Sequence, residues 1–551
     1  MAIDLPPALP PQLTAQQEVA RYSENYATVQ RKIGKYELRI SGEHGLTQEE
    51  LNAILDKSQS PSQAILLINS SSHKKGLLLV RFFYTSPVNG VINVHAIQHR
   101  VGHIQGPDFL QRHFSSLTGD RELIRKEFQT PAILAGLRAD RAGVNYTVSY
   151  EQNTQINALD LVFSETPIED FNPASFKAQL GNQGSRFAGR YFFDAGLTYN
   201  FSSGTEFGAG YETALTDWGE ARDGKDYHRI QLQLNHPYSF GLYGIEASHA
   251  EYERNITAKT IQTTFCVLPL LCIPTSNTSE SPLSLDAKIQ QIALTGNQVL
   301  SSDLDHRFML NQRIEFTDSE VNTQHSEALQ DERYATATLG ANYYSASLQN
   351  NRLFTWKVGL AVEGGLGSDQ GTLGSDNDSQ GVTAGKRSAR FVALKPTADV
   401  SYSLTKNSRA LLSIKGQISN EQLPQQQQWV LGGMERLSAY LPGVLVGDSG
   451  YHLDAALSHR STWGGLTLDS EFFVEYGSAQ FENAAGTSPN GGTDYSIDSS
   501  LADAGFRFTL SYREWLTLNA VAARPLDDSN ISKQQLEEAE ADFFVTMKIT
   551  L

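Results

Sequence analysis

The tetrapeptide Gly447-Asp-Ser-Gly450 is the part of the sequence closest to a catalytic motif. It matches the short nucleophile signature of trypsin-like proteases, in which the serine needs a histidine base oriented by a buried acid. No cysteine-flanked histidine motif lies upstream, and residues 451–457 continue with the apolar–polar alternation of a strand. We therefore predict that the chain is not an enzyme and has no catalytic residue.

Residues 376–379, Asp-Asn-Asp-Ser, are the best candidates for a metal site because their oxygen atoms could bind calcium. They lack the spaced loop and the terminal glutamate of a calcium-binding hand, so a solvated loop is the favoured interpretation. The 13 histidines are scattered, with no pair at a spacing typical of metal ligands. We expect neither a metal nor a cofactor.

A third stretch, Leu431-Gly-Gly-Met-Glu-Arg-Leu-Ser-Ala-Tyr440, combines features of a docking loop. The paired glycines allow a backbone conformation that side chains would forbid. The following residues alternate polar and apolar, as in a short extended segment, and a solvated loop has little use for so many apolar side chains. We interpret residues 421–449 as a loop that folds back and docks, with these candidate site residues: Gly432, Gly433, Arg436, Leu437, Ser438 and Tyr440.

The length, charge and hydropathy of the chain limit the number of its domains and the classes of partner that it can bind. A chain of 551 residues is long enough for two to four domains. Its net charge of −17, with no basic stripe to offset it, argues against a nucleic-acid partner. No apolar run approaches the roughly 20 residues that a membrane-spanning helix needs.

The two cysteines, Cys266 and Cys272, lie close together in one loop-like segment. This spacing favours a local disulfide in an oxidising compartment, with two free thiols as the alternative. The surrounding residues 265–274 are apolar for a loop, and contact with a partner or lipid competes with simple local packing. The first residues have no apolar targeting core, so either a signal peptide has been removed or the chain is cytosolic.

The N-terminal third is predicted to be α+β. Residues 1–34 begin with a proline-rich extended leader, and Thr14 with Gln17 then opens an amphipathic helix of about five turns that ends near Gly34. Residues 35–97 read as β-α-α-β-β, and residues 98–168 repeat that order. Each unit would leave a sheet edge that can pair with an extended chain.

From residue 174 onward strict alternation replaces the helical period, as in residues 190–201 and 541–551. A soluble sandwich and a membrane barrel both fit alternation. The segments run about nine to thirteen residues, aromatic side chains cluster near their ends, and short turns alternate with long polar loops, including ones near 256–283 and 320–333. These features favour a transmembrane β-barrel of about 16 antiparallel strands over residues 169–551, with residues 177–181 and 543–551 paired to close it.

Two β-α-α-β-β repeats, such a barrel, and Gly-Gly-x-x-x-Leu-x-x-Tyr in its sixth long loop resemble a known family. It is the two-partner secretion transporters of the TpsB type, the hemolysin/hemagglutinin secretion-activation proteins. Residues 181–185 with Gly189, and Ala523-Arg-Pro-Leu526, also fit. Family members often plug the pore with an N-terminal helix on a long linker, whereas here only residues 33–35 would separate that helix from the first strand.

The resemblance implies that the repeats are polypeptide-transport-associated (POTRA) domains in the periplasm, and that the barrel lies in the bacterial outer membrane. It implies a monomer that captures an unfolded secreted partner and exports it to the cell surface. The alternatives are an insertase of outer-membrane proteins from the same superfamily, which usually carries more such repeats, and a general porin. A porin explains neither the repeats nor the docking loop.

The chain departs from the family in the sixth loop. The family hallmark is Val-Arg-Gly-Tyr, and its arginine meets an aspartate of a Phe-x-Asp-x-Gly motif on the barrel wall. Here the matching segments are Leu437-Ser-Ala-Tyr440 and Phe473-Val-Glu-Tyr-Gly477, so serine replaces the arginine and Glu475 replaces the aspartate.

A substitute for the missing arginine is available two residues earlier. In an extended segment Arg436 would point to the same side as Ser438. On residues 465–477 the apolar positions alternate with three acids that would face the lumen. We therefore expect Arg436 to pair with Glu475 first, or with Glu471 or Asp469, while a solvated Arg436 is the alternative.

Overall fold

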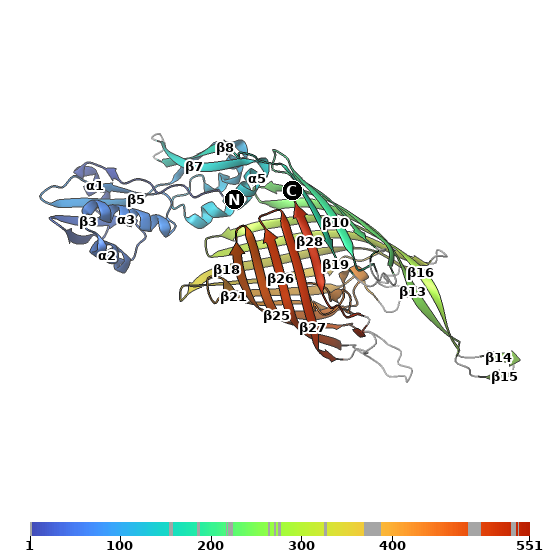
Figure 1. The fold of residues 1–551 in the computed structure, drawn as a ribbon. Coiled ribbons are helices and arrows are strands. Elements are labelled where there is room, and N and C mark those ends of the chain that lie inside the picture. The colour runs from blue at the N-terminus through green and yellow to red at the C-terminus, as the bar shows by residue number, and fades with distance from the viewer. Residues whose placement is uncertain are drawn as a thin grey trace.

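The structure is a computed structural model, and it consists of two small α+β units followed by a β-barrel (Figure 1). It describes residues 3–153, 158–184, 188–215, 218, 224–262, 265–268, 271–273, 277–323, 328–368, 387–482, 498–529, 536–537 and 539–551. Among the described helices, none is both long and apolar enough to cross a membrane.

The barrel is closed by 16 of the described strands, each antiparallel to its neighbours. In chain order the strands are β9 (Ala174–Gly181), β10 (Phe192–Asn200), β11 (Glu206–Ala214), β12 (Gly224–Tyr238), β13 (Gly241–Gln262), β16 (Asn277–Ser302), β17 (His306–Thr323), β18 (Ala328–Gln349), β19 (Arg352–Gly365), β20 (Val392–Ser403), β21 (Ser408–Ser419), β24 (Ser449–Trp463), β25 (Leu466–Gln480), β26 (Asp498–Tyr512), β27 (Leu516–Ser529) and β28 (Phe544–Thr550). The predicted barrel of about 16 strands is confirmed.

The alternation of side chains divides each strand between the two faces of the wall. On β12 the outward side chains of Ile230, Leu232 and Leu234 are exposed, whereas Arg229 and Gln231 line a polar cavity of about 350 Å³ inside the barrel. On β25 the outward residues are Phe472, Val474 and Tyr476. The outward positions of both strands are thus apolar and the inward positions of β12 polar, which is the arrangement that the period of two predicts.

Closure depends on the pairing of the first and last strands. β28 pairs with β9 over five residue pairs, from Thr546 opposite Gly181 to Thr550 opposite Lys177. The predicted pairing of these two strands is confirmed. It leaves the barrel without an open edge, whose unpaired N–H and C=O groups would otherwise need partners.

Two connections predicted as long loops are instead extensions of the strands. β13 and β16 run to 22 and 26 residues and pair as far as Gln262 opposite Asn277, so most of the loop predicted near 256–283 is a hairpin. β17 and β18 likewise extend through Thr323 and from Ala328. The prediction was wrong because a polar segment beyond the barrel can continue a ladder whose backbone groups are already aligned.

The predicted cysteine pair lies at the far end of the β13–β16 hairpin (Figure 1). The short strands β14 (Phe265–Leu268) and β15 (Leu271–Ile273) pair, with Cys266 opposite Cys272. The side chains of residues 254–283 lie outside the described part of the structure, so the disulfide and the role of the apolar tip stay predictions. Residues 376–379 also lie outside the described residues.

The predicted β-α-α-β-β order is present in both N-terminal units. The first contains β3 (Tyr36–Gly42), α2 (Gln48–Lys57), α3 (Pro61–Lys74), β4 (Val80–Tyr84) and β5 (Val91–Gln98). The second contains β6 (Val101–Gln105), α4 (Asp108–His113), the 3-10 turn η1 (Ser115–Leu117), α5 (Arg125–Ala142), β7 (Val144–Asn153) and β8 (Ala158–Pro167). Thr47 caps α2 in a capping box with Glu50, and Gly143 ends α5 in a left-handed conformation.

The long amphipathic helix predicted before the first unit is wrong in length. Helix α1 covers only Gln16–Ser23, and Val29–Ile33 forms strand β2, which pairs with β3. A two-residue strand β1 (Gln12–Leu13) adds parallel to β4, so the sheet order is β1-β4-β5-β3-β2. The spacing of Val29 and Ile33 fits a helix and a short strand equally well. Pairing with β3 stabilises the strand.

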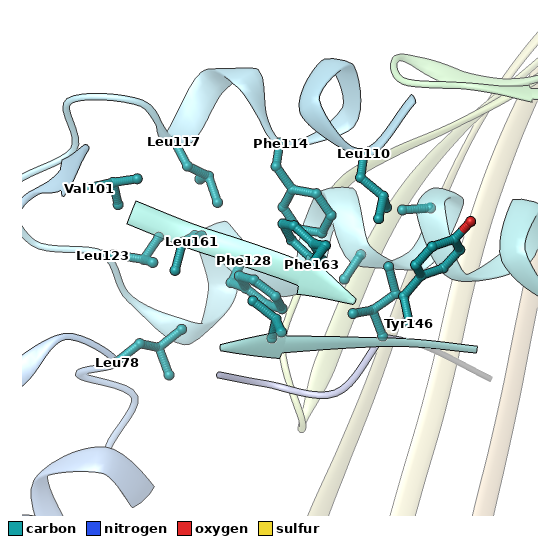
Figure 2. Packing of buried hydrophobic residues seen from close by; sticks show 14 of the residues in the cluster. Leu78, Val101, Leu110, Phe114, Leu117, Leu123, Phe128, Tyr146, Leu161 and Phe163 are labelled. Atoms are coloured by element: carbon teal, nitrogen blue, oxygen red, sulfur yellow. The ribbon is translucent and has the colours of Figure 1, made fainter. Parts of the chain in front are cut away.

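The core of the second unit is formed by α4, α5 and one face of the sheet β6-β8-β7, and Leu78, which precedes β4 of the first unit, is buried in the same cluster (Figure 2). Phe114 packs against both Phe128 and Phe163, with ring centroids 5.0 and 4.8 Å apart. Leu110 and Tyr146 extend this core toward the barrel end of α5.

Helix α5 also joins this unit to the barrel. Arg141 pairs with Glu206 at the start of β11 (3.0 Å), and the hydroxyl of Thr130 accepts a bond from the backbone N–H of Ser302 (3.1 Å). Gly204, in the turn between β10 and β11, has a φ of +78° and lies so close to Arg138 that a Cβ would meet its side chain at 2.4 Å. The second unit therefore sits against the short turns of the barrel.

The closure of the barrel can be tested by cross-linking its first and last strands. Ala178 and Ile549 are directly opposed on the outward face, and opposed antiparallel residues have Cβ atoms about 4.5–5.5 Å apart. We expect the variant Ala178→Cys/Ile549→Cys to form a disulfide in isolated membranes, detected by gel mobility before and after reduction.

The matched control is Gln179→Cys/Ile549→Cys, because Gln179 points to the other face of the same strand. A cross-link in the control alone, or in neither variant, would contradict the register.

Candidate functional site

The connection between β21 and β24 turns into the barrel. Its two arms, β22 (Trp429–Leu431) and β23 (Leu445–Gly447), pair with each other, and residues 432–444 form the tip. We call residues 421–448 the sixth loop. Gly432 and Gly433 have φ values of +106° and +96°, and a Cβ on Gly432 would lie 2.2 Å from the carbonyl oxygen of Leu441. The glycine pair is therefore required for the chain to fold back on itself.

The tip packs on the inner face of the barrel wall. Leu437, Ser438, Ala439 and Tyr440 are at most 1% exposed. The three apolar ones share one cluster with inward residues of the wall, including Phe473, Leu501 and Phe544. Gly477 on β25 gives Leu437 room, because a Cβ there would lie 3.0 Å from a methyl group of Leu437. The glycine of the Phe473–Gly477 motif thus serves the close approach of the loop.

A second segment covers the tip from the other side. The backbone N–H of Leu441 donates to the carbonyl of Ala539 (2.7 Å), and the N–H of Ala541 donates to the carbonyl of Ala439 (2.8 Å). Leu536 and Ala541 also belong to the apolar cluster. The tip is consequently held between the wall and the chain that leads into β28.

Two carboxylates of the wall accept backbone N–H groups of the tip. The N–H of Ser438 donates to Oε2 of Glu475 (2.8 Å), and the N–H of Ala439 donates to Oδ2 of Asp503 (2.7 Å). Glu475 and Asp503 are opposed residues of β25 and β26, and both side chains are fully buried. Two neighbouring backbone N–H groups of the tip thus end on buried acid side chains of the wall, and this pair of contacts fixes the position of the tip.

The cation that pairs with Glu475 comes from the wall. Arg507 on β26 donates from Nη2 to Glu475 (2.7 Å) and from Nη1 to Glu471 (2.6 Å) and Asp454 (2.8 Å). Its guanidinium lies 3.7 Å from the ring centroid of Phe473. Nε2 of His452 lies 3.3 Å from Oε1 of Glu475, on the side of β24. One arginine thus bridges three acids, a task for which its planar fork of donors is suited.

Arg436, which the sequence suggested as the substitute cation, points elsewhere. Its guanidinium lies 5.0 Å above the ring of Trp429, at the base of the loop. The prediction that Arg436 pairs with Glu475 is therefore wrong. It assumed an extended segment, whereas Leu437 has a φ of +56° and the N–H of Tyr440 bonds back to the carbonyl of Leu437. The turn at Leu437 breaks the alternation that would have placed Arg436 and Ser438 on one side.

The other predicted residues divide between two places. Ser438 reaches Glu475 through its backbone N–H, while its hydroxyl donates to the carbonyl of Met434 (3.3 Å). Glu471 belongs to the Arg507 group. Asp469 lies farther along β25, where Arg460 holds it through two bonds of 2.8 and 2.9 Å.

Arg507, Asp503, Asp454 and His452 were missed by the sequence reasoning. A signal for Arg507 was present, because it lies between the outward aromatics Phe506 and Phe508 and is therefore an inward basic residue on an alternating strand. What the sequence lacked was the register that puts Glu471 opposite Arg507.

The protease-like tetrapeptide is a structural corner. The carboxylate of Asp448 accepts the backbone N–H groups of Leu423 (2.8 Å) and Glu482 (3.0 Å), and Ser449 donates to Glu482 (2.8 Å). These bonds tie the start and end of the sixth loop to the end of β25. The residues of the motif are thus engaged in holding the loop base.

Among the residues that the structure describes, one group of acids has the spacing of metal ligands: Asp318, Glu320 and Asp331, at the outer ends of β17 and β18. Arg333 lies 3.2, 3.0 and 3.5 Å from these three carboxylates. The arginine therefore supplies the positive charge that a metal ion would bring.

Comparison with known proteins supports the fold. No family model and no curated protein matches the chain. Among solved structures, CdiB from Escherichia coli matches with a TM-score of 0.63 and 14% identity, over 97% of this chain and 96% of CdiB. CdiB from Acinetobacter baumannii matches with a TM-score of 0.55 and 14% identity, over 100% and 94%. BamA from Haemophilus ducreyi lacking POTRA domains 1–3 matches with a TM-score of 0.50 and 13% identity, over 95% and 100%. The chain thus has the fold of two POTRA-like units and a 16-stranded barrel.

The role of Arg507 can be tested by its removal. Arg507→Ala leaves three acids without their cation, and breaking a buried ion pair on one side costs roughly 3–5 kcal/mol. We expect a loss of that order in the free energy of unfolding, measured by denaturant titration in lipid vesicles. The free energy of unfolding of Arg507→Lys should lie between those of the wild type and Arg507→Ala. Lysine keeps the positive charge, but an ammonium cannot bridge three carboxylates in one plane.

Arg460→Ala is the matched control, since the Arg460–Asp469 pair lies on the same wall but is exposed. Such pairs contribute under about 1 kcal/mol. Equal losses for Arg507→Ala and Arg460→Ala would contradict the central role of Arg507.

Proposed function

We propose that this protein is an outer-membrane transporter of the two-partner secretion type, which exports an unfolded partner protein from the periplasm to the cell surface. The observation that carries the proposal is the combination of a POTRA-like unit docked on the short turns of the barrel with a sixth loop docked inside it. The two CdiB structures, which match over nearly their whole length, are TpsB-type transporters, and such transporters work with secreted partner proteins.

The outer surface of the barrel supports a place in a membrane. Ile230, Leu232 and Leu234 on β12 are 51, 46 and 45% exposed, and Phe506 and Phe508 on β26 are 52 and 42% exposed. Monomeric soluble proteins rarely expose contiguous apolar patches of more than a few hundred Å². A bilayer would cover these side chains, and the closed ladder pairs most of the strands' backbone groups, which lipid cannot satisfy.

Position in the membrane follows from the asymmetry of the barrel. The second unit contacts the short turns at one end, such as the one at Gly204, and the sixth loop enters from the opposite end. If the short turns face the periplasm, as they do in outer-membrane barrels, the two units lie in the periplasm and the long hairpin of β13 and β16 reaches outward.

Transport would then begin at the second unit and continue through the lumen. The polar cavity lined by Lys177, Arg229 and Arg313 offers side-chain hydrogen bonds to an extended polypeptide. The periplasm has no ATP, so net movement would come from folding of the partner outside the cell. The docked tip narrows the lumen, and passage would require the contacts of Ser438 and Ala439 to open.

One observation favours an insertase as the second candidate. The seam between β9 and β28 has five residue pairs, fewer than the eight between β9 and β10. A short seam costs less to open, and an opening there would give a nascent outer-membrane strand an edge with which to pair.

The proposal predicts that deletion of residues 99–165 abolishes export while the barrel still reaches the outer membrane. The reason is that the deletion removes the unit that contacts the mouth of the barrel. The open reading frames beside this gene are first searched for a large secreted protein, and the measurement is the amount of it that appears at the surface of cells carrying both genes.

Arg141→Glu is a milder variant, since it breaks the 3.0 Å pair with Glu206 without removing the unit. It should reduce export, and the added change Glu206→Arg should restore it. Normal export by the deletion variant would argue for a passive pore. Loss of other barrels from the outer membrane, with export absent throughout, would instead favour the insertase.

A further inference from the structure

The start of the chain lies against the second unit, although it precedes the first unit in sequence. Figure 1 places the N-terminus beside α5 rather than at the far end of the first unit. Ile3 and Leu9 are buried in the same core as Phe128 and Tyr146 of the second unit, and Leu5 packs against that core. We call residues 3–11 the leader.

Polar contacts hold the leader across both units. The carbonyls of Pro6 and Leu9 face α3 of the first unit, where Nε2 of His73 lies 2.9 Å from the former and Nδ2 of Asn69 donates to the latter at 2.9 Å. The hydroxyl of Tyr150, on β7 of the second unit, donates to the carbonyl of Ala8 (3.4 Å). The leader then continues directly into β1.

The place that the leader occupies is a groove between α5 and β7. Ile3 and Asp4 line a pocket of about 500 Å³ there together with Gly136 and Ala139 of α5 and Tyr146 of β7. The small residues of α5 leave the groove wide. In the described part of the second unit, β7 is an edge strand, because its sheet has the order β6-β8-β7. The groove has apolar side chains such as Ala139 and polar ones such as Asp140 and Thr147, and an edge strand beside it is a surface on which an extended segment can add.

The leader covers this groove without using the edge. No strand pairing joins residues 3–11 to β7 in the described structure. The leader contains four prolines, which have no N–H to donate, so it cannot form a continuous ladder. A segment with similar apolar side chains and free N–H groups would fill the groove and gain the backbone hydrogen bonds that the leader lacks.

We propose that the leader is a displaceable strap, which occupies in cis the groove where an extended segment of the exported partner binds. The partner segment would carry apolar side chains at alternate positions and few prolines, and it would pair with the free edge of β7. The leader would keep the groove closed to unrelated chains until such a segment displaces it. This inference rests on the proposed function.

A disulfide that locks the strap provides the test. Ile3 and Ala139 line the same pocket, so the variant Ile3→Cys/Ala139→Cys should close a bond across the groove. We expect the oxidised variant to export the protein encoded beside the gene at least about tenfold less than the wild type, and a reductant added to the cells to restore export.

The matched control is Leu13→Cys/Tyr84→Cys, which joins opposed residues of β1 and β4 and ties down the root of the leader without closing the groove. It should export normally. Normal export by the oxidised lock would overturn the strap and leave the proposed function intact. Absence of export by the wild type and by every reduced variant would instead count against the proposed function.

A binding measurement tests the strap without export. The probe is a fluorescent peptide with the sequence of residues 3–13, added to the full-length protein in detergent. A leader tethered in cis competes at an effective concentration on the order of 1 mM, so a peptide with a Kd of about 100 µM should bind the wild type about tenfold more weakly than a variant whose leader is released.

The released variant is Ile3→Ser/Leu5→Ser/Leu9→Ser, which removes the apolar side chains that hold the leader in the groove. Equal affinity of the probe for this variant and the wild type would overturn the proposal. If the variant does not fold, the oxidised and reduced forms of the lock give the same comparison, because only reduction lets the probe enter.

Discussion

The carboxylate of Glu475 is the group on which the site depends, because a fully buried charge must be compensated where it stands. Its compensation comes from Arg507 on the next strand and from the backbone N–H of Ser438 in the sixth loop. The wall therefore supplies charge and the loop supplies only hydrogen bonds. The tip therefore docks on the wall through its backbone atoms. Gly477 on β25 has no side chain, which lets the loop come close to the wall. The tip carries serine at residue 438, and the cation beside Glu475 is Arg507 of the wall.

The need to hold a cation beside the buried Glu475 also links the parts of the molecule. The acids and Arg507 lie on β24, β25 and β26, so their spacing is set by the register of the barrel, and the register is held by closure between β9 and β28. The tip in turn binds residues 539–541, which lead into β28. The docked tip therefore lies next to the chain that leads into the closing strand.

At the other end of the barrel, α5 contacts the short turns with one face and borders the groove of the leader with another. A segment captured in that groove lies directly before the barrel mouth.

Much of this architecture was readable from local patterns, and the failures have specific causes. Alternation from residue 174 onward predicted strands, faces and closure, because a period of two assigns each side chain to one side of a wall. The β-α-α-β-β repeats were visible from helix boundary signals, such as Thr47 with Glu50 and Gly143, set between short strand patterns. The helix predicted through Val29 failed because a five-residue strand carries too little pattern to distinguish periods, and pairing with β3 decided it. Arg436 was chosen on the assumption of an extended tip, which a positive φ at Leu437 breaks. Arg507 required knowledge of which strands are neighbours and in what register, and no short motif carries that information.

The central claim is that the tip of the sixth loop rests on the inner wall at β25, and a disulfide between the two tests it most directly. Leu437 lies against Gly477, so Leu437→Cys/Gly477→Cys should cross-link in isolated outer membranes without denaturant. Glu435 is exposed on the same tip, and Glu435→Cys/Gly477→Cys should not. A cross-link at residue 437 and none at residue 435 is the result that the docked loop predicts. Equal cross-linking of both positions, or of neither, would contradict it.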